Sequence, residues 1–110
     1  MSAGNSICFF GVRIDLDREA MELVETRVHP LVRLARANKL HVYYGDMNRP
    51  HERYQLFIGH LFANLGLEGS AEVSLTAEEL SRTMSETTER LCAAGIPDEP
   101  RMWFQHEPDC

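Results

Sequence analysis

A run of apolar and aromatic residues at positions 54–65, YQLFIGHLFANL, constrains the fold more than any other part of the sequence. Successive side chains of a strand point to opposite faces of the sheet. One face of this run would carry Tyr54, Leu56, Ile58, His60 and Phe62, and the other would carry Gln55, Phe57, Gly59 and Leu61. Because both faces are largely apolar, the run predicts an interior strand with both faces at least partly covered. The run contains no residue pattern that is typical of a catalytic or ligand-binding motif.

Three further strands are expected from the same alternation. Residues 6–16 have an unbroken apolar face and predict a second interior strand, whereas residues 40–45 and 101–106 predict two shorter ones. The polar connector over residues 45–53 contains a proline and is long for a hairpin loop. Long irregular loops of this kind often carry function.

Two helices are expected between the strands. The first begins after Asp17, whose side chain can cap it, and ends near Asn38, a plausible left-handed stop. Pro30 interrupts its apolar stripe, so we expect a kink or a break at residues 28–30.

The second helix has the clearer signals. Thr76 and Glu79 match a capping box at its start, and Gly95 followed by Pro97 matches its end. With both helices in place, the predicted core comprises Phe10, Val12, Ile14, Val24, Leu31, Ile58, Leu80, Met84 and Leu91.

The predicted elements follow the order strand–helix–strand–strand–helix–strand, which is the split βαβ or ferredoxin-like pattern of an α+β protein. This pattern puts the strands at 6–16 and 54–62 in the middle of a four-stranded antiparallel sheet, with two helices on one face and a linker at residues 63–70. These are also the two most apolar strands, so composition and topology agree. We expect one domain over residues 1–110, with residues 1–5 disordered and residues 107–110 forming a tail.

The net charge of −6 argues against nucleic acid or an anionic membrane as the main partner. Residues 1–67 carry +1 and residues 68–110 carry −7, so the acidity belongs to the C-terminal part. This asymmetry is typical of a solvated face or, alternatively, of a surface for a basic partner. The acidic surface we single out consists of Glu78, Glu79, Glu86 and Glu89.

Three widely spaced cysteines, Cys8, Cys92 and Cys110, favour reduced thiols over a disulfide framework. No apolar run approaches the roughly 20 residues needed to span a bilayer, and the N-terminus does not resemble a signal peptide. A cytoplasmic protein is therefore expected.

The histidines show neither HExxH spacing nor an accompanying CxxC pair. We therefore expect no metal and no other cofactor. If the fold brought His51, His60 and His106 together, these three would be the candidate ligands.

His60 interrupts an apolar sheet face, where burial could tune its pKa for general-base catalysis. It could equally be a partly buried histidine bonded to a backbone carbonyl or to Tyr44. In the enzymatic alternative, His60, Tyr44 and Tyr54 are the candidate catalytic or ligand-binding groups, in a cleft between sheet and helices of a dimeric split βαβ protein.

Two helices can cover only one face of a four-stranded sheet. An apolar second face then requires a partner, a ligand or a second copy of the chain, unless it is an ordinary half-exposed face. A twofold homodimer is the solution we favour. The interface we expect consists of Phe9, Phe57, Leu61 and Trp103.

These observations favour a small acidic cytosolic interaction module without catalysis. Its partner would be a protein or a second copy of itself. An inhibitor of the immunity or antitoxin kind, facing a basic protein, is a concrete version. An enzyme or small-molecule-binding protein is the alternative.

Overall fold

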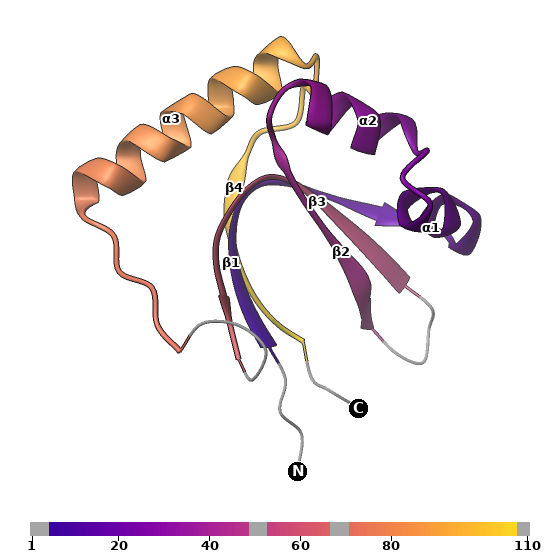
Figure 1. Cartoon of the computed structure of the whole chain (residues 1–110), viewed down its shortest axis with the longest axis horizontal. Coiled ribbons are helices and arrows are strands. Elements are labelled where there is room, and N and C mark those ends of the chain that lie inside the picture. Colours follow the sequence, from indigo (N-terminus) through magenta and orange to yellow (C-terminus); the bar gives the residue numbers. More distant parts are fainter. Residues whose placement is uncertain (1–4, 49–52, 67–70, 108–110) are drawn as a thin grey trace.

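The computed structural model describes residues 5–48, 53–66 and 71–107, with the backbone alone at 45–48, 53 and 107. Figure 1 shows the elements. In chain order they are β1 (Asn5–Leu16), α1 (Arg18–Glu25), α2 (Pro30–Ala37), β2 (His41–Asn48), β3 (Arg53–Leu65), α3 (Ala77–Ala93) and β4 (Arg101–Glu107). Strand residues thus begin at Asn5 and end at Glu107, one residue beyond the expected strand at each end of the chain.

The four strands form one sheet in the order β2-β3-β1-β4, and each neighbouring pair is antiparallel. The two long strands, β1 and β3, therefore occupy the interior positions, as their two-sided apolar pattern predicts. The α+β class and the four-stranded antiparallel sheet are confirmed.

The sheet is strongly bent, and its two interior strands, β1 and β3, bend together (Figure 1). Gly11 pairs with Gly59 near the middle of both strands, and a Cβ on either residue would collide with a backbone carbonyl oxygen of the other strand. Two glycines are therefore required for so close an approach. The β1–β3 register also shifts between Cys8 and Phe9, and such an irregularity adds to the bend.

All three helices pack on the convex side of the bent sheet (Figure 1). Their buried side chains, among them Val24, Ala35 and Leu91, form one cluster with Val12 and Ile58 of the sheet. The cluster holds the helices and one sheet face together through the burial of apolar surface.

The expected break in the first helical segment is confirmed. α1 ends at Glu25, and α2 begins at Pro30, where a missing amide hydrogen does no harm in the first turn. The Nδ1 atom of His29 caps α2 by accepting a hydrogen bond from the Leu31 amide at 3.1 Å.

The left-handed stop lies one residue beyond its predicted position. Asn38 has φ −103°, whereas Lys39 has φ 58°. The Leu40 amide donates back to the Ala35 carbonyl at 2.9 Å, which fixes Lys39 as the residue that reverses the chain.

Both ends of α3 are confirmed. The Glu79 amide donates to the Thr76 hydroxyl at 3.0 Å, and the Thr76 amide donates to the Glu79 carboxylate at 3.4 Å. At the other end Gly95 has φ 77°, and the Ile96 amide donates to the Leu91 carbonyl at 3.1 Å.

The predicted core is confirmed on the sheet and only in part on α3. Phe10, Val12, Val24, Ile58 and Leu91 are buried, and Ile14 and Leu31 pack against the core while remaining partly exposed. The prediction was wrong for Leu80 and Met84, which are half-buried and lie outside the core clusters. The reason is that α3 buries only Thr87 and Leu91, in its C-terminal half. None of the helices described here is long and apolar enough to cross a bilayer.

Candidate functional site

A pocket of about 430 Å³ lies between the sheet and the segment that leads into α3. We call it the apolar pocket. Residues of β1, β3, β4 and the segment at 71–76 line it: Ser6, Ile7, Cys8, Phe62, Ala63, Leu65, Val73, Leu75, Phe104, Gln105 and His106.

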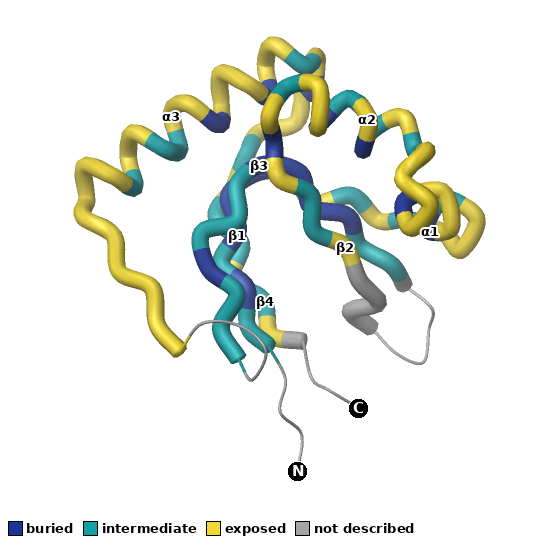
Figure 2. The backbone as a smooth tube through the Cα atoms, in the orientation of Figure 1, coloured by how far each residue is buried: buried dark blue, intermediate teal, exposed yellow. Residues whose placement is uncertain are grey.

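The bend of the sheet accounts for this pocket. Toward the start of β1 and the end of β3, the sheet curves away from α3 (Figure 1). The buried residues of α3, Thr87 and Leu91, lie in its C-terminal half, so this half holds the helix to the core. The segment at 71–76 therefore overhangs the sheet and is exposed throughout (Figure 2).

Three large apolar side chains of the apolar pocket remain in contact with water. The exposed fraction is 43% for Val73, 41% for Leu75 and 79% for Phe104. Isolated exposed apolar residues are common on proteins, whereas three that line one pocket form an apolar surface at which another apolar group can bind.

The polar groups of the apolar pocket are few. The Ser6 hydroxyl and the Nδ1 atom of His106 are hydrogen-bonded at 2.9 Å. The Cys8 thiol points to the Met102 sulfur at 3.6 Å, and burial raises the pKa of this thiol. A thiol with a raised pKa stays protonated at neutral pH and is a poor nucleophile. The pocket is therefore built for apolar contact.

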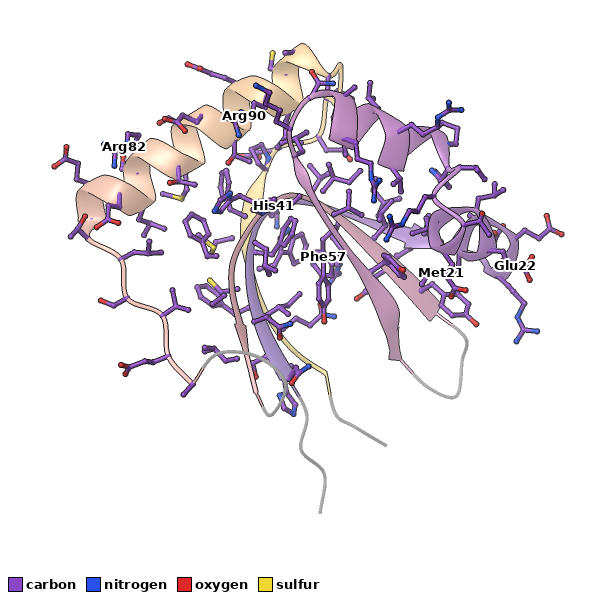
Figure 3. All side chains as sticks on the ribbon, viewed as in Figure 1. Met21, Glu22, His41, Phe57, Arg82 and Arg90 are labelled. Atoms are coloured by element: carbon purple, nitrogen blue, oxygen red, sulfur yellow. The ribbon has the colours of Figure 1, made fainter. Side chains whose placement is uncertain are left out.

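The four residues expected at a dimer interface share the concave face of the sheet. The rings of Phe9 and Phe57 have centroids 5.4 Å apart, and those of Phe57 and Trp103 are 6.2 Å apart. Leu61 and Tyr43 pack against the same cluster. Figure 3 shows Phe57 within the bend.

This aromatic cluster is closed within a single chain. The Trp103 indole donates to the Gly11 carbonyl at 3.0 Å, and the Arg13 guanidinium lies 4.2 Å from the Trp103 ring centroid. Phe9 and Phe57 are consequently fully buried. Of the four predicted residues, Leu61 and Trp103 are half-buried and keep some surface for a second copy, and binding there stays a prediction.

His60 lies on the side of the sheet that faces α3. Its ring stacks on His41 at 4.6 Å, and the Nδ1 atom of His41 accepts a hydrogen bond from the Leu61 amide at 3.0 Å. Burial lowers the pKa of His60, and His41 and Arg90 lower it further against an opposing effect of Glu86. Figure 3 shows His41 and Arg90 on the same side of the sheet.

The register separates His60 from the two candidate tyrosines. Tyr44 pairs with Leu56, and His60 follows Leu56 by four residues on β3, which is about 13 Å along a strand. Tyr54 lies still farther along and packs against the core. The structure therefore does not bring these three side chains into one site.

The candidate metal ligands are also apart. His106 pairs with Ser6, and His60 pairs with Phe10, four positions along β1 or about 13 Å away. His51 lies outside the described residues. Within the described ranges, no group of three or more His, Cys, Asp or Glu side chains could hold a metal ion.

The acidic residues singled out from the sequence all lie exposed on α3: Glu78, Glu79, Glu86 and Glu89. Arg82 and Arg90 stand on the same helix (Figure 3), so the charge is mixed along it. A role of this helix in partner binding stays a prediction.

The sequence interpretation missed the apolar pocket. One signal was present, because Val73 and Leu75 alternate with Glu72 and Ser74 and so give an extended segment one apolar side. Phe104 shared an apolar strand face with Met102 in the same way. The alternation could not show that these two segments face one another across a gap.

No protein-family model, no curated protein and no solved structure matches the chain.

Proposed function

We propose that this chain is a small interaction module without catalysis, which receives apolar side chains of a protein partner in the apolar pocket. The observation that carries the proposal is the open pocket itself, with Val73, Leu75 and Phe104 left in water along it. Interfaces gain most of their affinity where a few apolar anchors enter such a pocket.

The charge of the adjacent helix supports a basic partner. α3 begins directly after the pocket segment and exposes Glu78, Glu79, Glu86 and Glu89. Acidic side chains around an apolar site speed the association of a basic protein and disfavour an acidic one. An inhibitor of the immunity or antitoxin kind, bound to a basic protein, is the concrete version that we propose.

We also propose a ferredoxin-like fold and a cytosolic location for the chain. The element order and the strand order β2-β3-β1-β4 support a ferredoxin-like split βαβ topology. Cys8 and Cys92 are free thiols, which supports a cytosolic location.

The test is affinity capture from the native cell with three immobilised forms of the chain, each followed by mass spectrometry. Val73→Asp introduces a carboxylate into the pocket, and Val28→Asp introduces one at an exposed apolar residue outside it, with 51% of Val28 accessible. We expect the wild type and V28D to retain the same basic protein, and V73D to lose it. Retention of that protein by V73D would refute the proposal.

A small apolar ligand is the second candidate, and the size of the pocket favours it. Ligand pockets range from about 300 to 1,000 Å³, and the apolar pocket measures about 430 Å³. Native mass spectrometry of the purified chain separates the candidates. A bound small molecule in the wild type that is lost in V73D favours the ligand, and an unliganded wild type favours the protein partner.

A further inference from the structure

The outer side of β4 is an open edge of the sheet. β4 pairs with β1 on one side, and no other described strand pairs with it. An edge strand presents unpaired backbone donors and acceptors, and proteins commonly protect it with charged side chains, proline or a bulge. Within β4, RMWFQHE, the charged side chains, with histidine neutral, are only at the two ends, Arg101 and Glu107, Pro100 precedes the strand, and the register with β1 is regular.

We propose that β4 pairs antiparallel with β4 of a second copy, about a twofold axis at Phe104, so that the two sheets become one. This proposal does not require the proposed partner protein, although Phe104 belongs to both surfaces. The occupant is a second copy because the strand is complementary to itself in this one register.

The complementarity lies in the charges. With the axis at Phe104, Arg101 is opposite the partner's Glu107, and the twofold repeats this pair at the other end of the strand. Opposite charges directly across two antiparallel strands stabilise the pairing, and like charges oppose it. Moving the register by two residues would put Arg101 opposite a glutamine or beyond the end of the strand, so both pairs would be lost.

The most exposed large apolar side chain of the chain's described part lies on the axis. Phe104 is 79% exposed and lines the apolar pocket. A twofold axis perpendicular to a sheet keeps each face on its own side, so Phe104 and the partner's Phe104 meet as a cross-strand aromatic pair. The two pockets then lie side by side on one face of the joined sheet.

The test uses the charge pair, because each chain carries both halves of it. Within one chain Arg101 pairs with Gly11 and Glu107 pairs with Asn5, so charge reversal at either position puts no like charges opposite each other on β1. R101E and E107R each put like charges at both ends of the homodimer. A mixture of the two variants restores opposite charges at both ends of the mixed dimer.

Sedimentation equilibrium at micromolar concentrations gives the readout, with circular dichroism as the check on folding. We expect the wild type to dimerise, R101E and E107R to dimerise about tenfold or more weakly, and their mixture to regain the wild-type affinity. R33E changes an exposed arginine on α2 and should dimerise as the wild type does. F104D should be a folded monomer.

A monomeric wild type would overturn the proposal. A wild-type dimer that neither single charge reversal weakens would overturn it as well, and would direct attention to Leu61 and Trp103 on the concave face. If the mixture of R101E and E107R does not regain the wild-type dimer affinity, the register with Phe104 on the axis is excluded. None of these outcomes bears on capture by the V73D variant, so the two proposals fail separately.

Discussion

Replacing Leu91 by alanine tests how α3 is attached to the rest of the molecule. Leu91 is 2% exposed and belongs to the cluster that joins α3 to Val12 and Ile58 of the sheet. Only Thr87 and Leu91 are buried on this helix, so one side chain carries much of its apolar contact. Truncation of a fully buried leucine lowers the free energy of unfolding by about 2–5 kcal/mol, depending on how far the cavity collapses.

The matched control is Leu80→Ala on the same helix. Leu80 is half-buried and lies in the N-terminal half of α3, beyond the core clusters. The L80A and L91A substitutions remove the same atoms and raise helix propensity by the same amount. L80A leaves no cavity in the core, because Leu80 lies outside the core clusters. We expect a loss of about 1 kcal/mol or less.

Urea titration followed by circular dichroism measures both variants. Unchanged denaturant slopes would show that each variant unfolds in one cooperative step, so that the midpoints report stability alone. A loss below about 1 kcal/mol for L91A, or equal losses for L91A and L80A, would refute attachment through the C-terminal half of α3.

Four further predictions follow from the structure. Thr76→Ala removes the hydroxyl that caps α3 and should lower the free energy of unfolding by about 1 kcal/mol, measured in urea beside Thr76→Ser as the conservative control. Gly59→Ala should lower the melting temperature sharply, because the added Cβ would collide with the Phe10 carbonyl oxygen. Gly95→Ala should lower it less, because the added Cβ meets no other atom and only the positive φ of position 95 is unfavourable for alanine. The lowered pKa of His60 means that the unfolded chain binds a proton more readily, so stability should fall as the pH falls from about 6.5 through the folded pKa. H60Q should flatten this part of the pH profile. EDTA should leave the melting temperature unchanged, and stoichiometric zinc in the purified chain would contradict this expectation.

Local chemistry explains what could be predicted from the sequence. The capping box at Thr76 and the proline at position 30 act through neighbouring backbone groups, so their positions set helix boundaries in any context. Strand positions followed from alternation for the same reason. The left-handed stop was misplaced by one residue because Asn38 and Lys39 can both end a helix, and the contact of Leu40 with the core decides between them.

Features that depend on the bend of the sheet could not be predicted. Alternation placed Phe9 and Phe57 correctly on one face, but it could not show that this face folds on itself. Trp103 packs against Phe57 and the Arg13 guanidinium lies over the Trp103 ring, and these contacts join strands far apart in the sequence. Leu80 and Met84 were assigned to the core because they share a helical stripe with Leu91, and this spacing cannot show that the core contacts the C-terminal half of α3 alone.

The bend of the sheet explains both the burial of Phe9 and Phe57 and the position of the apolar pocket. The bent sheet buries Phe9 and Phe57 within a single chain, so these two rings are not available to a partner on the concave face. The same bend carries the start of β1 and the paired end of β4 away from α3. The apolar pocket opens there on the convex side, and Phe104 is left in water. The exposed apolar surface that the sequence predicts on one face is therefore found on the other, beside the open edge of β4. An interaction module of this shape would contact its partners at that edge and in that pocket.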